Sequence, residues 1–172
     1  MKNIVLIGMP SAGKSTVGVI LAKTLGMNFI DTDLVIQEKT SRLLQNIIND
    51  DGINNFLEIE ESSILSLKVK NTVIATGGSV VFCNKAIKYL KLDGIVVYLK
   101  VRFEEIVKRL DDITTRGVVL ANGQNLKDMY NQRSPLYEKY SDITIDCSKK
   151  SVEEIIFNVT NVIKEEVLWE KL

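Results

Sequence analysis

Residues 8–15 read Gly8-Met9-Pro10-Ser11-Ala12-Gly13-Lys14-Ser15, which matches the Gly-x-x-x-x-Gly-Lys-Ser pattern of a phosphate-binding loop. An apolar run at residues 3–7 precedes the loop and has the length of a buried strand. Apolar residues at helical spacing follow the loop up to Leu25. Strand, loop and helix therefore occur in the order that such a loop requires. The stretch predicts an α/β fold that binds a nucleoside triphosphate.

The residue types in this loop suit the recognition of phosphate groups. Gly8 and Gly13 let the backbone turn its N–H groups inward, where a Cβ would collide or a positive φ is required. Lys14 is expected to lie along the β and γ phosphates, and the Ser15 hydroxyl to ligate Mg²⁺. The helix that begins here points the positive end of its dipole at the anion.

Length and composition exclude several classes of protein. A chain of 172 residues with 45% apolar residues predicts a single domain over residues 1–172. Lys plus Arg and Asp plus Glu both number 22, so no overall charge draws the molecule to nucleic acid or to an acidic membrane. The absence of His excludes Ser-His and Cys-His catalysis. Cys83 and Cys147 form no disulfide or zinc pattern, and no apolar run approaches the ~20 residues of a membrane span, so we expect a soluble cytoplasmic protein.

The rest of the chain alternates between strand and helix patterns. Further strands are predicted at residues 28–30, 72–75, 94–99 and 142–145. Helices are predicted at residues 34–39, 43–49, 56–68, 84–90, 103–110, 126–137 and 152–164. This alternation predicts a parallel sheet covered by helices on both faces. Ligands bind such sheets beyond the carboxyl ends of the strands, so the residues directly after each strand are candidates for the site.

Two carboxylates follow the second predicted strand, in the sequence Asp31-Thr32-Asp33. We assign Asp31 to the metal ion and Asp33 to the base that accepts a proton from an attacking hydroxyl. The alternative is structural, because Thr32 or Asp33 can cap the helix that follows.

Two glycines and three arginines are the other polar candidates. Gly77 and Gly78 follow the third strand and can expose N–H groups to a substrate, although such pairs are often plain turns. Arg116 lies in a segment at residues 112–124 that is either a lid over the phosphates or a surface loop. Arg133 can grip a carboxylate with two hydrogen bonds. Arg109 either flanks the adenine or is a solvated arginine on a helix face.

Taken together, these motifs have the order and spacing of the shikimate kinases, which the chain resembles over almost its whole length. The motifs are residues 8–16, Asp31-Thr32-Asp33, Thr76-Gly77-Gly78, Arg116 with Leu120, and Arg133-Ser134-Pro135-Leu136-Tyr137. The resemblance implies a P-loop NTPase-type three-layer α/β/α fold with a five-stranded parallel sheet, a lid and a substrate-binding helical region at about residues 34–64. It implies a kinase that uses MgATP to phosphorylate the 3-hydroxyl of shikimate in aromatic amino-acid biosynthesis. By the same resemblance Asp33, Gly77, Gly78 and Arg133 contact shikimate and Arg116 contacts phosphate.

The chain departs from the family pattern at one substrate anchor. The family's Phe-Arg-x-x-Glu motif appears as Phe56-Leu57-Glu58-Ile59-Glu60, so Leu57 replaces an arginine that helps to hold the shikimate carboxylate, and Glu60 is expected to lack its partner. Loss of one charge-assisted hydrogen bond is expected to weaken carboxylate binding by about tenfold to over a hundredfold, unless Arg42 or Lys39 compensates. Ser11 replaces a glycine of the family's loop, and Gly117 replaces a proline after Arg116. Neither of these two replacements is expected to abolish phosphoryl transfer.

The leading hypothesis is therefore a shikimate kinase, expected to act as a monomer on a small hydroxy acid. The alternatives are a related kinase of another small hydroxylated substrate and a nucleotide-binding protein without kinase activity. In the mechanism we expect, Asp33, Lys14 and Arg116 are catalytic, and Ser15 and Asp31 hold Mg²⁺. The residues expected to bind ATP are Gly8, Ser11, Ala12, Gly13, Lys14, Ser15, Thr16, Arg109 and Arg116.

Overall fold

The apolar run before the phosphate loop forms the central strand of a β-sheet in the computed structural model, which describes residues 2–111 and 123–169. Within these residues the elements are β1 (Asn3–Ile7), α1 (Lys14–Leu25), β2 (Asn28–Asp31), α2 (Thr32–Thr40), α3 (Leu44–Leu65), β3 (Thr72–Ala75), the 3₁₀-helix η1 (Val80–Phe82), α4 (Asn84–Leu92), β4 (Gly94–Lys100), α5 (Phe103–Asp111), α6 (Leu126–Tyr140), β5 (Ile143–Asp146) and α7 (Val152–Trp169). The five strands pair in parallel in the order β2-β3-β1-β4-β5. The predicted five-stranded parallel sheet is confirmed.

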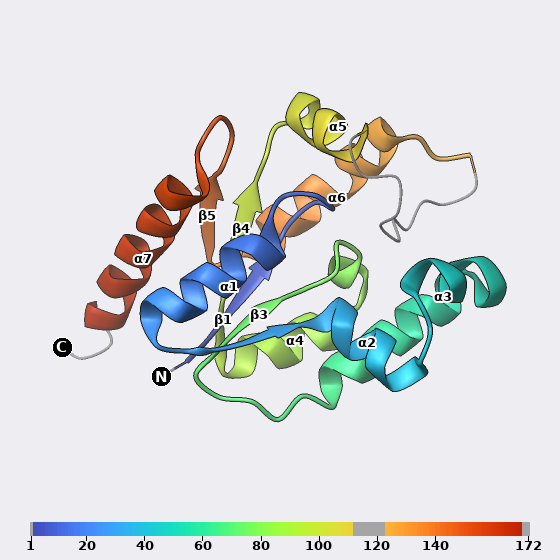
Figure 1. Cartoon of the computed structure of the whole chain (residues 1–172), viewed down its shortest axis with the longest axis horizontal. Coiled ribbons are helices and arrows are strands. Elements are labelled where there is room, and N and C mark those ends of the chain that lie inside the picture. Colours follow the sequence, from blue (N-terminus) through green and yellow to red (C-terminus); the bar gives the residue numbers. More distant parts are fainter. Residues whose placement is uncertain (1, 112–122, 170–172) are drawn as a thin grey trace.

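Strand β1 is buried along its whole length because strands flank it on both sides and helices cover both faces. Val5 lies in register with Ile74 of β3 and with Val96 of β4. Because every strand runs in the same direction, the ends of β1, β2 and β3 meet at one edge of the sheet (Figure 1). The phosphate loop, Asp31 and Thr76 therefore converge on that edge.

The helices form the outer layers of the predicted three-layer arrangement. Helices α1 and α7 pack against each other on one face of the sheet, while α4 and α6 contact β4 from the other face (Figure 1). Tyr98 of β4 stacks on Tyr137 of α6 with ring centroids 5.1 Å apart, which ties α6 to the sheet. No helix in the described ranges is long and apolar enough to cross a membrane.

Helices α2 and α3 form a separate unit at the carboxyl edge of the sheet (Figure 1). They pack on each other around a small apolar cluster of Ile36, Leu44, Ile47 and Phe56, which is distinct from the main core. This unit covers most of the region that the sequence predicts to bind the substrate.

The helix pattern between residues 43 and 68 differs from the prediction. In place of two helices with a gap, α3 runs from Leu44 to Leu65 and is interrupted only at Gly52, with φ 83° and ψ 166°. Polar, exposed residues around the break hide the helical periodicity of this stretch in the sequence. The three residues of η1 are too few to leave a periodic pattern, and the sequence does not predict this element.

Candidate active site

The phosphate loop has the backbone geometry that its glycines permit. Gly8 and Gly13 have φ values of 149° and 95°, and Ser11 also has a positive φ of 62°. A Cβ on Gly8 would lie 2.8 Å from the carbonyl oxygen of Leu99, so β4 leaves no room for a side chain there. Gly13 precedes α1 in the left-handed conformation, which turns the chain from the loop into the helix.

Lys14 is held inside the loop. Its Nζ donates to the carbonyl oxygens of Gly8 and Met9, each at 2.9 Å, and the residue is only 8% exposed. The loop backbone thus holds the ammonium group of Lys14 inside the loop.

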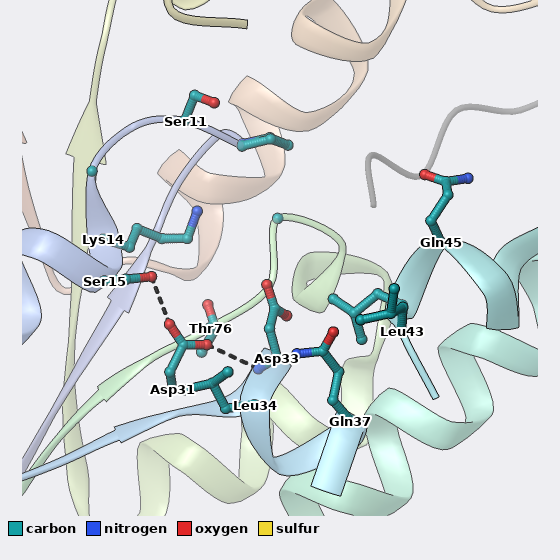
Figure 2. Close-up of a pocket in the computed structure, with 14 residues that line it drawn as sticks. Ser11, Lys14, Ser15, Asp31, Asp33, Leu34, Gln37, Leu43, Gln45 and Thr76 are labelled. Carbon is teal, nitrogen blue, oxygen red and sulfur yellow. Dashed lines mark hydrogen bonds between the residues drawn. The ribbon is translucent and has the colours of Figure 1, made fainter. Parts of the chain in front are cut away.

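Ser15 and Asp31 meet at the end of the loop as the sequence predicts. Ser15 Oγ donates to Asp31 Oδ2 at 2.6 Å, and Asp31 Oδ1 accepts from the backbone N–H of Asp33 at 3.0 Å (Figure 2). The second bond makes Asp31 the N-cap of α2. The alternative that Thr32 or Asp33 is the cap was therefore wrong, and the capping carboxylate is the one assigned to the metal. A hydroxyl and a carboxylate at this spacing are hard oxygen donors of the kind that Mg²⁺ prefers.

Arg109 reaches the phosphate loop from α5. Its Nη1 donates to the carbonyl oxygens of Ser11 at 3.3 Å and Ala12 at 3.4 Å, and its Nη2 pairs with Glu105 at 3.4 Å. The side chain therefore packs against the outside of the loop and is not a fully solvated arginine. Thr16, by contrast, is exposed on the first turn of α1.

The glycine pair after β3 lies against the end of α2 and the phosphate loop. A Cβ on Gly78 would lie 2.8 Å from Cδ of Pro10, and one on Gly77 would lie 2.4 Å from Glu60 Oε1. The N–H of Gly77 donates to Thr32 Oγ1 at 3.2 Å. The hydroxyl of Tyr137 donates to the Gly78 carbonyl at 2.6 Å, a contact that the sequence did not predict. Close packing, and not only turn formation, therefore requires glycine at both positions.

Arg133 lies at the inner end of the site on α6. It is 2% exposed, and its guanidinium carbon lies 5.4 Å from the centroid of the Phe82 ring. It lines a small cavity with Asp33, Gly77 and Gly78. The structure thus brings together the four residues predicted to contact the substrate.

Glu60 is fully buried beside this cavity, and Ser79 and Cys83 are its hydrogen-bond partners among the described residues. Its Oε2 accepts from Ser79 Oγ at 2.7 Å and from Cys83 Sγ at 3.7 Å. Burial raises the pKa of the Glu60 carboxyl to about 7, and the hydrogen bond from Ser79 limits that rise. The sequence analysis missed this pair, because Glu60 and Ser79 lie on separate elements, α3 and the turn before η1.

Arg42 and Lys39, the side chains named above as able to compensate for Leu57, are engaged elsewhere. Leu57 is partly buried and packs against both apolar clusters. Arg42 pairs with Asp50 at 2.9 Å and Asp51 at 2.6 Å, and Lys39 donates to Ser66. Neither cation is among the residues that line the pocket, so the structure does not support compensation by Arg42 or Lys39.

One pocket of about 330 Å³ joins the phosphate loop to α2 and α3. Figure 2 shows Ser11, Lys14 and Ser15 on one side and Leu43 and Gln45 on the other, with Asp33 between them. The pocket thus has a phosphate end and an apolar, amide-rich end on either side of a carboxylate. Most of the predicted lid, including Arg116, lies outside the described residues.

Comparison with known proteins agrees with this geometry. A model of the family described as shikimate kinase matches residues 10–164. A shikimate kinase of Thermodesulfovibrio yellowstonii is 39% identical over 168 residues, covering 96% of this chain and 95% of that protein. One from Clostridium botulinum (strain ATCC 19397 / Type A) is 42% identical over 160 residues, covering 91% and 93%.

A solved structure has the same fold. It is a shikimate kinase from Acinetobacter baumannii in complex with shikimate, with a TM-score of 0.86 and 31% identity, covering 96% of this chain and 94% of that one. The matched model spans most of the chain, and relatives about 40% identical cover nearly all of it. The chain therefore belongs to the shikimate kinase family, whose members are ATP-dependent phosphotransferases.

Proposed function

We propose that the chain transfers the γ-phosphoryl group of MgATP to the 3-hydroxyl of shikimate. The observation that carries the proposal is that Asp33 lines both the pocket that contains Lys14 and the small cavity that Arg133 and the glycine pair line. The phosphate loop supplies the donor end, and a carboxylic acid fits the end that Arg133 lines.

Each catalytic role follows from the position of a group. Asp33 lies between the two ends and accepts the proton of the attacking hydroxyl. Lys14 stabilises the charge that develops on the transferred phosphoryl group. Ser15 and Asp31 would hold Mg²⁺, which neutralises phosphate charge when bound. Arg109 supports the loop near the nucleotide, and Arg116, which lies outside the described residues, is assigned to the phosphates from the sequence.

The first experiment is a coupled assay of ADP release with MgATP, with and without shikimate. We expect shikimate-dependent turnover that Asp33→Asn lowers by at least a hundredfold while binding of a fluorescent ATP analogue stays within twofold. Glu38→Gln, an exposed change further along the same helix, is the matched control and should turn over like the wild type. Near-normal turnover of Asp33→Asn would exclude Asp33 as the base.

Leu57 favours a second candidate, a kinase of another small hydroxylated substrate. With Leu57 packed among apolar residues, Arg133 is the arginine that lines the acceptor end within the described chain. Leu57→Arg separates the two candidates in the same assay. Turnover of shikimate by the wild type supports the first proposal, whereas turnover only by Leu57→Arg supports a different natural acceptor.

A further inference from the structure

Glu105 is a carboxylate on the first turn of α5 that joins separate segments of the chain. The backbone N–H of Lys149, in the turn between β5 and α7, donates to its Oε1 at 3.1 Å and to its Oε2 at 3.2 Å. The same Oε2 lies 3.4 Å from Nη2 of Arg109, one turn further along α5. The mechanism proposed above gives Glu105 no role, although its partner Arg109 reaches the phosphate loop.

Arg109 extends this connection to the phosphate loop. Its Nη1 donates to the carbonyl oxygens of Ser11 and Ala12, so one guanidinium group bridges two loop carbonyls and one carboxylate. A guanidinium holds its donors in a rigid, planar fork, and fixing Nη2 on Glu105 therefore also fixes the direction of Nη1. The carboxylate thus sets where the fork meets the loop.

The two carbonyls belong to a part of the loop with an unusual backbone. Ser11 and Gly13, on either side of Ala12, both have a positive φ, which is unfavourable for a serine. No peptide bond of the described residues is cis, so each N–H points away from the C=O of its own peptide group. Because Arg109 holds the Ala12 carbonyl on the outside of the loop, the N–H of Gly13 points inward. Inward N–H groups of this kind form a concave site for anions.

We propose that Glu105 is a positioning residue for the nucleotide, which acts through Arg109 on the phosphate loop. By holding the guanidinium group against the two carbonyls, Glu105 keeps the inward N–H groups aimed at the phosphates of MgATP. This role rests on the proposed function for the identity of the nucleotide and makes no use of the acceptor. It concerns the phosphates and not the base of the nucleotide.

The sign of the effect distinguishes positioning from a simple effect of charge. A carboxylate near the loop repels phosphate groups, so removing its charge alone would strengthen the binding of MgATP. Releasing Arg109 has the opposite effect, because the loop then loses a hydrogen bond that orders it. We therefore expect Glu105→Gln to weaken MgATP binding by about threefold to tenfold, which corresponds to one hydrogen bond.

The experiment measures the Kd of MgATP and of magnesium tripolyphosphate by competition with a fluorescent ATP analogue, without an acceptor. Glu105→Gln should weaken both ligands by the same factor, because tripolyphosphate lacks the base but keeps the phosphates. Glu104→Gln removes the same charge from an exposed neighbour on α5 and should bind both ligands like the wild type. In the turnover assay, the KM of Glu105→Gln for shikimate should stay within twofold of the wild-type value.

Arg109→Lys tests the route from Glu105 to the loop. A lysine keeps the charge but has no fork, so it cannot bridge the carboxylate and both carbonyls. The Kd of MgATP should therefore rise in Arg109→Lys, and adding Glu105→Gln should change it by less than twofold more. Fully additive effects of the two changes would mean that Glu105 acts by another route, and they overturn the inference.

Two further outcomes overturn the role of Glu105. Unchanged or tighter binding of MgATP by Glu105→Gln leaves at most an effect of charge. Weaker binding of MgATP with unchanged binding of tripolyphosphate places the effect at the base of the nucleotide. If Glu105→Gln does not fold, Glu105→Asp, which keeps the charge on a shorter side chain, decides by the same criteria. Absence of shikimate turnover in a wild type that binds MgATP overturns the proposed function alone.

Discussion

Two neutral side chains, Leu57 and Ser79, accompany the buried carboxyl group of Glu60. Leu57 lies one turn before Glu60 on α3, and its side chain packs against the apolar core. Ser79 follows β3, nineteen residues after Glu60, and donates to its Oε2. A hydroxyl is a weaker partner than a guanidinium for an ionised carboxylate. A neutral partner such as Ser79 therefore favours the protonated form of Glu60 more than a cation would.

The same carboxyl group should make stability depend on pH. Folding raises the pKa of Glu60 from about 4.5 to about 7, so its contribution is complete below pH 4.5 and is lost as the pH rises through 7. A pKa difference of this size corresponds to at most ~3 kcal/mol in the free energy of unfolding. The free energy of unfolding in urea should be measured for Glu60→Gln and for the wild type at pH 5 and at pH 8. The difference between the two proteins should shift in favour of the variant at pH 8. An equal difference at both values contradicts the raised pKa.

Gly8 should be sensitive to the smallest added side chain. Gly8→Ala places a Cβ 2.8 Å from the Leu99 carbonyl at a φ of 149°, so either the loop or β4 must shift. We expect affinity for an ATP analogue to fall at least tenfold, measured by titration calorimetry. Gly26→Ala is the control, because its φ of 66° is also strained while its Cβ meets open space. It should cost ~1 kcal/mol of stability and leave ATP binding unchanged.

At the level of elements, the break in α3 at Gly52 lies between two residues that line the small cavity beside Arg133. Leu44 precedes Gly52, Phe56 follows it, and both line the small cavity beside Arg133. The φ of 83° and ψ of 166° at Gly52 are open to glycine alone. The relative direction of the two halves of α3 therefore depends on one residue.

Gly52→Ala is expected to cost about 1–3 kcal/mol, or to straighten α3 and move Leu44 away from Phe56. The KM for shikimate should rise at least fivefold while the KM for MgATP stays within twofold. Asn54→Ala, an exposed change in the same helix, should alter neither. If the two variants behave alike, the break has no part in shaping the acceptor end.

The strands and the phosphate side of the site could be predicted from the sequence, because local patterns encode them. Apolar runs predicted the strands, and the loop motif predicted the places of Lys14 and Ser15. The Glu60–Ser79 pair could not be predicted, because it depends on how α3 packs beside η1. The capping role of Asp31 was missed for a different reason, since one carboxylate serves both α2 and Ser15.

For the molecule as a whole, ligand binding should report which groups hold the nucleotide. A ligand that binds only the folded state stabilises it by about 2.7 kcal/mol at a hundred times its Kd. MgATP should therefore raise the Tm of the wild type by several degrees in a thermal-shift measurement. Lys14→Ala should lose most of that shift, whereas Lys23→Ala, an exposed change at the end of α1, should keep it. A full shift in Lys14→Ala contradicts the role assigned to this lysine.

The central place of β1 has a consequence for how the molecule is made. β1 is translated before its partner β4, which begins at Gly94, and Gly8 rests against the carbonyl of Leu99 in β4. At typical rates of synthesis the intervening segment takes on the order of ten seconds to appear on the ribosome. A nascent chain that stops before β4 thus carries the complete phosphate-loop motif but lacks the strand that packs against Gly8. Capture of ATP must wait until the second half of the sheet has been synthesised.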